Sequence, residues 1–370
     1  MNKTILCVVG ATLLIAGCSR PPMPARFSVQ PGELLHFVPV AEKLVALSFD
    51  DGPNDPCTRQ LLDVLAKENV HATFMLIGMN AEKHPDMVKQ IVAGGHAIGN
   101  HSYSHPRFDK CSPNTIREQI TLNDAILEKL TGQKPQLMRP PFGLYGPDYF
   151  EICRATGHVV GGWSASASDW NPHTPQDIAE ALLDQLMPGV IFLLHDGKET
   201  NDGPHRVATV QAVAQFIPQI KARGYRFVTI PELRAAAVAP LAAFDNGAQL
   251  LGVQWPELRA DTPELTFRFH WQLPADLTRR GVRAWLRLSQ NGKDCGWWAA
   301  DLPAGGDVWK ETETLKARRP PSMTAGSYTV EICLTHGGHR AWQRLAVGSN
   351  LPEQRRRITL PSPLVLDAIK

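Results

Sequence analysis

The sequence predicts an α/β fold, with a parallel sheet and crossover helices, followed by a smaller all-β sandwich-like domain. Between residues 44 and 233, short apolar runs alternate with amphipathic segments, which is the order of elements in parallel α/β sheets. Beyond residue 246 the pattern changes to alternating, aromatic-rich runs separated by Gly, Pro, Asn and Asp, which is typical of antiparallel sheets. The 370 residues are enough for two separate cores.

Seven apolar runs are predicted as strands. In chain order they read LVALSF, ATFMLI, HAIGN, PQLMR, HVVGGW, GVIFLLH and YRFVTI. Apolar residues at helical spacing predict helices between them, over Thr58 to Asn69, Pro113 to Leu130 and about Arg206 to Arg223. Seven strands favour a closed or nearly closed α/β barrel, and an open doubly wound sheet is the alternative.

The N-terminus has the pattern of an export signal. Lys3 precedes an apolar run of 13 residues from Ile5 to Gly17, which is shorter than the ~20 residues of a membrane span. The run ends in LIAGC, which resembles a bacterial lipobox and makes Cys18 the expected lipidated first residue of the mature protein. We therefore expect an exported lipoprotein anchored to the cell membrane or outer membrane, and a plain cleaved signal is the alternative.

Composition excludes a strong polyanion-binding character. Charged residues make up 20% of the chain and the net charge is +2, so we expect no nucleic-acid partner. The oligomeric state stays open. The pattern changes predict a signal peptide at 1–18, a linker at 19–40, a catalytic domain at 41–236, a second linker at 237–248 and a β-sandwich-like accessory domain at 249–368.

Ionisable residues gather where the predicted strands end. Asp50 and Asp51 close the run LVALSF, and His101 and His105 follow HAIGN at a spacing of four residues. The carboxyl ends of barrel strands form one face. A helical turn there would point both imidazoles the same way, and with a carboxylate they would leave coordination positions open, as in catalytic metal sites.

Three later strand ends also carry reactive side chains. Arg139 begins RPPFG, Asp169 and Trp170 lie in SASDWNP, and His195 ends IFLLH. Each residue alone is more often a surface ion pair or a buried histidine. Together, five ionisable strand ends out of seven indicate a single active site.

The stretches LSFDDGP, GNHSYSH, RPPFG, SASDW and LLHDG, in this order, resemble the five motifs of the polysaccharide deacetylases, the NodB-type family also called carbohydrate esterase family four. HATFMLIG and ARGYRFVTIPEL are also similar to that family's second and last strands. The resemblance covers residues 44 to 233 and implies a distorted (β/α)7 barrel.

The resemblance implies a role for each motif residue. Asp51, His101 and His105 would hold a divalent metal, usually zinc. Asp50 would be the general base and His195 the general acid, with Arg139 orienting Asp50 and Asp169 orienting His195. Phe142 and Trp170 would shape the substrate site. Phe142 stands where the family often has tyrosine, and Ser166 replaces an acid that many members carry three residues before DW.

These roles imply a hydrolase of linear amides that removes acetyl groups from an N-acetylhexosamine polymer, such as peptidoglycan, a chitin-like chain or poly-N-acetylglucosamine, at the cell envelope. O-deacetylation of a polysaccharide such as xylan is one alternative. A non-catalytic carbohydrate-binding lipoprotein is the other, although all five proposed metal-binding and acid–base residues are present. The accessory domain carries Trp297 and Trp298, where one exposed ring would suit glycan binding; its role stays open.

Export also bears on the cysteines, since disulfides form in oxidising compartments. Cys57 lies six residues after Asp51, and Cys111 six after His105. We therefore predict a Cys57–Cys111 bridge, with buried free thiols as the alternative. Cys295 and Cys333 both fall in the accessory domain and form a second predicted pair.

Overall fold

The computed structural model describes residues 26–243, 248–254, 264–273, 282–290, 293–302, 312–318, 326–336, 357–359 and 364–366. The predicted signal peptide and the lipidation site at Cys18 lie outside these residues. Within the described ranges, no helix has both the length and the apolar character that a membrane span requires.

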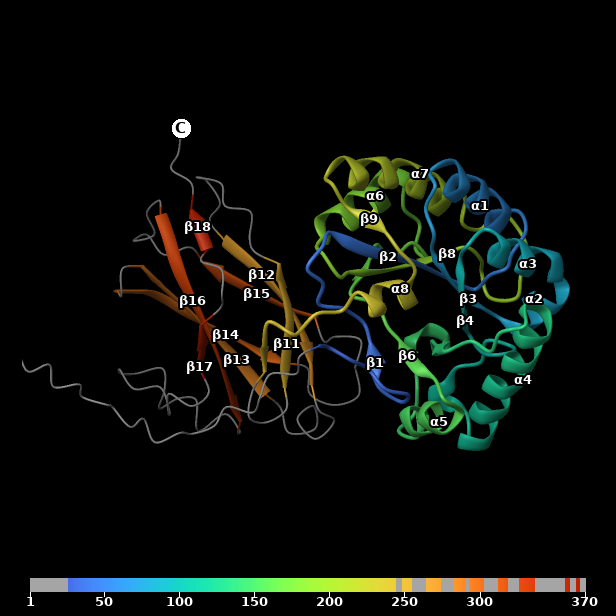
Figure 1. The fold of residues 1–370 in the computed structure, drawn as a ribbon, viewed down its shortest axis with the longest axis horizontal. Helices are drawn as coiled ribbons and strands as arrows, with labels where there is room; N and C mark the ends of the chain where they lie inside the picture. Colours follow the sequence, from blue (N-terminus) through green and yellow to red (C-terminus); the bar gives the residue numbers. More distant parts are fainter. Residues whose placement is uncertain are drawn as a thin grey trace, which may run out of the picture.

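The larger part of the chain is built on a curled parallel sheet, whose strands lie among the helices in Figure 1. Its hydrogen-bonded order is β1-β6-β5-β4-β3-β2-β8-β7, and β9 pairs with β2. Its strands are β1 (Leu34–Leu35), β2 (Leu44–Asp50), β3 (Thr73–Leu76), β4 (Ala97–Asn100), β5 (Leu137–Met138), β6 (Val159–Gly161), β7 (Ala165–Ser166), β8 (Ile191–His195) and β9 (Arg226–Phe227). The predicted NodB-type α/β barrel is confirmed: all seven predicted strands form, and two short strands, β1 and β7, are added.

Helices cover the outside of the sheet (Figure 1). They are α1 (Cys57–Lys67), α2 (Gly78–Lys83), α3 (Pro85–Ala93), α4 (Pro113–Thr131), α5 (Tyr149–Thr156), α6 (Pro175–Asp184), α7 (Val207–Ala222) and α8 (Ile230–Ala235), with short 3₁₀ turns η1 (Phe108–Lys110) and η2 (Pro141–Gly143). All seven residues of β2 are buried, because a parallel sheet covered by helices is apolar on both faces.

Local sequence sets the ends of α4. The Ser112 side chain accepts a hydrogen bond from the Thr115 N–H, and Pro113 takes the first helical position, where its missing N–H removes no helical bond. Gly132 ends the helix in the left-handed conformation at φ 74°.

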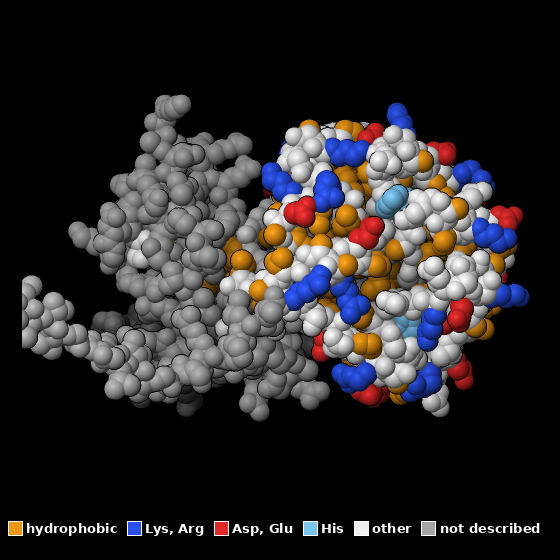
Figure 2. Space-filling model, viewed as in Figure 1, with side chains coloured by type: hydrophobic (Ala, Val, Ile, Leu, Met, Phe, Trp, Pro, Cys, Tyr) orange, Lys and Arg blue, Asp and Glu red, His pale blue; other side chains and the backbone are white. Residues whose placement is uncertain are grey.

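The surface of the barrel carries charges of both signs. On the described face in Figure 2, Lys and Arg side chains are interspersed with Asp and Glu.

The C-terminal part consists of two antiparallel sheets, as predicted for a sandwich-like domain. One sheet contains β10 (Ala242–Ala243), β11 (Gln249–Gln254), β12 (Glu264–Gln272) and β15 (Thr312–Arg318). The other contains β13 (Val282–Gln290), β14 (Lys293–Leu302), β16 (Gly326–His336), β17 (Arg357–Thr359) and β18 (Leu364–Leu366). β10 falls within the segment predicted as a linker and pairs with β11. The side chains of Trp297 and Trp298 lie outside the described residues.

Strands β11 and β12 contact the barrel directly. The His270 ring stacks on Phe37 with centroids 4.2 Å apart, and Arg268 forms an ion pair with Asp184 at 2.7 Å. A Cβ atom at Gly252 would lie 2.6 Å from the Phe37 ring. The contact therefore depends on a residue without a side chain at position 252.

The predicted Cys57–Cys111 disulfide is wrong. Cys57, Cys111 and Cys153 are all free thiols. The Cys57 thiol is instead used at the start of α1, where its Sγ lies 3.5 Å from the Gly203 carbonyl oxygen. The side chains of Cys295 and Cys333 lie outside the described residues; their strands, β14 and β16, pair with opposite edges of β13.

Candidate active site

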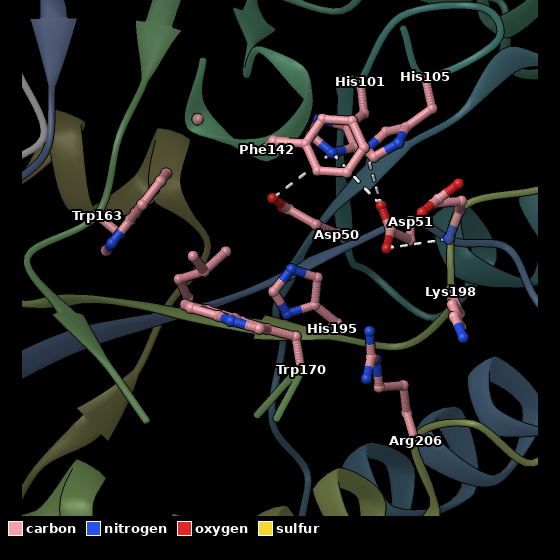
Figure 3. Close-up of a pocket in the computed structure, with 13 residues that line it drawn as sticks. Asp50, Asp51, His101, His105, Phe142, Trp163, Trp170, His195, Lys198 and Arg206 are labelled. Atoms are coloured by element: carbon pink, nitrogen blue, oxygen red, sulfur yellow. Dashed lines mark hydrogen bonds and ion pairs between the residues drawn. The ribbon is translucent and has the colours of Figure 1, made fainter. Parts of the chain in front are cut away.

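Parallel pairing brings the predicted site residues to one end of the sheet. Asp50, the last residue of β2, is in register with His195, the last residue of β8. A cavity of about 390 Å³ opens there. Seven predicted site residues line it: Asp50, Asp51, His101, His105, Phe142, Trp170 and His195 (Figure 3). The other two, Arg139 and Asp169, lie behind this lining and contact Asp50 and His195 respectively.

One carboxylate and two imidazoles converge at the top of the view in Figure 3. Asp51 Oδ1 lies 3.2 Å from His105 Nε2 and 3.6 Å from His101 Nε2. The three donor atoms lie within 4.8 Å of one another, and all three residues are buried. Donors about 2.0–2.2 Å from a common centre would be separated by such distances, so the cluster has the dimensions of a metal site.

The surroundings of the cluster fit a divalent cation. His101 Nδ1 lies 2.8 Å from the Arg139 carbonyl oxygen, which is the outer hydrogen bond that orients a metal-binding histidine. Apart from the Asp51 carboxylate at 3.2 Å from Nε2, the buried ring nitrogens of His105 have no partner in the described part of the chain, and buried polar atoms of this kind need one. Two imidazoles and one carboxylate form a donor set that zinc accepts.

The histidine segment does not form the helical turn that we expected. Residues 101–107 have no helical structure, and His105 has a positive φ of 59°. Polar side chains set the loop instead: Asn100 Oδ1 accepts from the Ser102 N–H at 2.8 Å, and Ser102 Oγ accepts from the His105 N–H at 3.0 Å. The imidazoles converge because of this loop and not because of helical spacing.

Helix α4 holds the same loop from behind. Asn123, which is buried in α4, donates from Nδ2 to the Leu76 and Ser102 carbonyl oxygens at 2.8 and 3.0 Å. Its neighbour Asp124 accepts from Asn100 Nδ2 at 2.7 Å. The loop that carries His101 and His105 is therefore tied to a helix that contributes nothing to the cavity lining.

Asp50 and Asp51 are adjacent but have different partners. Arg139 is fully buried and donates from Nη1 to Asp50 Oδ1 at 2.6 Å. Its Nε and Nη2 atoms donate to the carbonyl oxygens of Gly161 and Gly162, which fixes the guanidinium. Asp50 Oδ2 remains directed toward His101, at 3.7 Å from Nε2.

Burial alone would raise the pKa of Asp51. The contacts with His101 and His105, together with the charge of His195, instead hold that pKa well below its usual range. Asp51 also accepts the Glu199 N–H at 3.2 Å through Oδ2. The carboxylate is thus anionic at neutral pH, as a metal ligand must be.

Asp169 holds His195 in one orientation. Asp169 Oδ1 lies 2.8 Å from His195 Nδ1, and Oδ2 accepts both the His195 N–H and the Thr209 hydroxyl at 2.9 Å. Burial lowers the pKa of His195, but Asp169 and the more distant Asp51 and Asp50 raise it to about 9. His195 is therefore a cation at neutral pH with Nε2 available to the cavity.

Aromatic rings border the cavity. Phe142 and Trp170 are 51% and 46% exposed, and their rings lie 4.4 Å from His105 and 5.4 Å from His195, centroid to centroid. Trp163, which sequence reasoning took only as the end of a strand, also lines the cavity and receives the Arg139 guanidinium over its ring. The exposed rings suit stacking on a flat sugar face.

Sequence reasoning missed several further residues. Lys198, Glu199 and Arg206 line the cavity from the loop after β8. Asp196, in the same LLHDG motif, is buried against Gly52, where a Cβ would lie 2.3 Å from Asp196 Oδ2. Burial raises the pKa of Asp196 to about 7. The only sequence signal for these residues was their position just after a predicted strand.

Comparison with known proteins gives matches over the barrel. The family model described as Polysaccharide deacetylase matches residues 38–161. The chain is 39% identical over 189 residues to a peptidoglycan-N-acetylglucosamine deacetylase of Bacillus cereus, covering 51% of this chain and 67% of the relative. It is 34% identical over 196 residues to a chitooligosaccharide deacetylase of Bradyrhizobium sp. (strain ANU 289), covering 51% of this chain and 90% of the relative.

A solved structure matches the same part of the chain. The crystal structure of the Bc1960 peptidoglycan N-acetylglucosamine deacetylase, in complex with a naphthalenyl N-hydroxybenzamide, aligns with a TM-score of 0.52 at 36% identity. The alignment covers 56% of this chain and 95% of that chain. The similarity thus falls on the barrel that carries the site.

Proposed function

This chain belongs to the polysaccharide deacetylase family, and from that premise we propose that it is a metal-dependent N-deacetylase of an N-acetylhexosamine polymer at the bacterial cell envelope. The observation that carries the proposal is the convergence of Asp51, His101 and His105 beside Asp50 and His195 in one cavity. Relatives named as deacetylases of peptidoglycan N-acetylglucosamine and of chitooligosaccharides support the amide substrate.

Asp51, His101 and His105 would hold the cation, for which zinc is the proposed identity. A divalent cation supplies Lewis acidity, which makes water a competent nucleophile near neutral pH and polarises the acetyl carbonyl. Asp50 is placed to receive the proton that the attacking water loses. Arg139 occupies Oδ1 of Asp50, so Oδ2 is the oxygen available to take the proton.

His195 provides the acid. An amine leaves an acyl carbon readily only when it is protonated, and His195 Nε2 can donate that proton because Nδ1 is held by Asp169. The raised pKa of His195, about 9, keeps the imidazolium populated at neutral pH. Base and acid therefore act from two different strands, β2 and β8.

The exposed rings of Phe142 and Trp170 are proposed to position the sugar. Their places beside His105 and His195 put an aromatic edge at both the proposed metal and the proposed acid. Holding the acetamide in line with these groups lowers the entropic part of the barrier. The polymer, and not only one sugar unit, would extend along the open cavity.

We also propose that the protein is exported and anchored through lipid on Cys18. The support is the sequence alone: the apolar run from Ile5 to Gly17 and the LIAGC ending. Replacing Cys18 with alanine should release the protein from the membrane fraction of expressing cells. Retention of the Cys18→Ala protein in that fraction would contradict the anchor.

Acetate release tests the activity. Zinc-loaded protein would be assayed on chitin oligomers, peptidoglycan, poly-N-acetylglucosamine and acetylxylan, with and without a chelator. The proposal predicts acetate from at least one N-acetylated glycan and loss of that release with chelator. Acetate release from acetylxylan alone would show that the substrate is an O-acetyl ester and not an amide. No release from any glycan would refute the enzyme assignment.

A further inference from the structure

Two cationic side chains in the cavity have no part in the chemistry described above. Lys198 and Arg206 both belong to the loop between β8 and α7 and line the same cavity as Asp50 and His195. In Figure 3 they lie on one side of His195, while Trp163 lies on the other. The cavity therefore has an aromatic side and a cationic side.

Among the residues that the structure describes, no carboxylate forms an ion pair with Lys198 or Arg206, whereas Lys83, close to the same loop, pairs with Asp202. Within the described ranges, the guanidinium of Arg206 hydrogen-bonds to carbonyl oxygens, donating from Nε to Gly197 at 2.8 Å and from Nη1 to Asp169 at 3.5 Å. Arg206 is half-buried, so its charge is unfavourable without a counter-ion unless a ligand supplies one, whereas Lys198 is exposed and stays hydrated.

Two of the three carboxylates that line the cavity already have partners. Asp50 pairs with Arg139, and Asp51 belongs to the metal cluster. Glu199 is the one further carboxylate in the lining, so two cations face one anion, a surplus of one positive charge on this side. Figure 2 shows charges of both signs interspersed on the described face, so the surplus does not continue a broad basic surface there.

The loop that carries the two cations is held in place at several points. Gly203 donates its N–H to the Asp55 carbonyl oxygen at 2.9 Å. Asn80 Nδ2 donates to the carbonyl oxygens of Asp51 and Glu199, both at 2.8 Å. Asp202 accepts from His84 at 2.9 Å. Lys198 and Arg206 are thus presented from a fixed backbone, which lowers the entropic penalty of ligand binding.

We propose that Lys198 and Arg206 form a subsite for a carboxylate carried by the acetylated glycan, beside the acetamide that is cleaved. Arginine offers a planar fork that matches a carboxylate in two parallel hydrogen bonds, and lysine adds a point charge. The carboxylate belongs either to a lactyl ether on an N-acetylhexosamine or to a uronic acid next to one. The inference rests on the proposed function and names its substrate class.

A binding experiment, kept separate from turnover, tests the proposed carboxylate subsite. Metal-loaded Asp50→Asn protein would be titrated calorimetrically with two acidic tetrasaccharides: one of alternating N-acetylglucosamine and N-acetylmuramic acid, and one of alternating N-acetylhexosamine and uronic acid. The methylamide of each is its neutral control. At least one acid should bind about ten-fold more tightly than its methylamide, since charge-assisted hydrogen bonds are lost on amidation. The acidic tetrasaccharide that binds more tightly identifies the source of the carboxylate.

Substitutions at Lys198 and Arg206 test whether these two side chains cause the preference for the acid over its methylamide. In the Asp50→Asn background, Lys198→Gln should reduce the acid-to-methylamide affinity ratio several-fold, and Lys198→Glu should bring it to one or below. Lys67→Gln, which removes an exposed lysine from α1, outside the cavity lining, should leave the ratio unchanged. Arg206→Lys should keep part of the preference because the charge remains but the fork is lost.

Two results would overturn the subsite. One is equal affinity of both acids and their methylamides for the starting protein. The other is a ratio that Lys198→Glu leaves unchanged. Neither depends on turnover: if the wild-type protein released no acetate from any glycan yet its Asp50→Asn form still preferred an acid, the proposed function would fail and the subsite would stand.

Discussion

At the scale of single residues, Asp50 and Asp51 divide one site between two tasks. Two adjacent carboxylates at a strand end would repel each other if they shared one environment. Asp51 leaves the strand with a positive φ of 76°, and its carboxylate meets His101 and His105, while Asp50 is bound by Arg139. Different partners, set by one backbone turn, place the two carboxylates in different environments.

The two aspartates should respond differently to the same substitution. Asp51→Asn removes an anionic ligand, so the protein should lose most of its bound metal. Asp50→Asn leaves the three proposed metal ligands in place and should retain metal while turnover falls about 10²- to 10⁴-fold. Metal content and acetate release would be measured on the same samples. Normal turnover by Asp50→Asn would show that Asp50 is not the base.

His195 should set the alkaline limit of activity. Its pKa is raised above the ordinary value of 6.5 to about 9, so the acid form is present below that pH and is lost above it. The value of kcat/KM should therefore fall as the pH rises through this range. Bound cation at Asp51 would cancel part of the raising charge and move the limit to lower pH.

Asp169→Asn should move the alkaline limit of activity to a lower pH. The substitution removes the partner that raises the pKa of His195 most strongly, so the alkaline limb of kcat/KM should shift toward lower pH by one unit or more. The comparison is made on metal-loaded wild-type and variant proteins in the same buffers. An unshifted limb would mean that another group is the acid.

At the scale of elements, segments with a clear apolar run or helical period were predictable, and segments without one were not. The predicted helix from Pro113 to Leu130 forms as α4, because apolar spacing, Ser112 and Pro113 agree locally. Strands β1 and β7 are two residues each and lie outside the seven apolar runs that were predicted as strands. The convergence of His101 and His105 was predicted, but its cause was not, since the loop is shaped by side-chain hydrogen bonds.

Helix α4 should matter for both stability and metal binding. Asn123→Ala removes buried hydrogen bonds to the Leu76 and Ser102 carbonyls and should lower the free energy of unfolding by about 1–3 kcal/mol. Metal affinity should fall about 10- to 100-fold because the histidine loop loses its outer support.

The neighbouring position provides the control. Leu122 is 47% exposed on the same helix, so Leu122→Ala should change the unfolding free energy by no more than about 0.5 kcal/mol and leave metal affinity intact. Denaturant unfolding and metal titration measure both quantities. Equal behaviour of the two variants would remove the role assigned to Asn123.

At the scale of the whole molecule, the active site was more predictable than its specificity. Motif residues at strand ends are brought together by any parallel sheet, so Asp50 and His195 could be placed in one cleft from their order alone. Lys198 and Arg206 could not, because tertiary contacts from α2 and the β2–α1 loop position the loop that carries them. The N-terminal and accessory segments carry no motif that specifies a ligand.

Docking of the accessory domain on the barrel depends on Gly252. Gly252→Leu would force a side chain against the Phe37 ring, at an overpacking penalty of about 1–3 kcal/mol, and should increase the radius of gyration in small-angle scattering. Acetate release from a chitin oligomer should persist, because Gly252 is not part of the cavity lining. Gly146→Ala, whose Cβ has no neighbour closer than 3.8 Å, should change neither. An unaltered radius in Gly252→Leu would contradict the docking role.

The most direct test of the central claim is metal add-back on one sample. Chelator-treated protein would receive increasing zinc while bound metal and acetate release from an N-acetylated oligomer are measured together. The account predicts that the rate rises in proportion to occupancy and levels off at one ion per chain. Full activity in protein with no bound metal would contradict it.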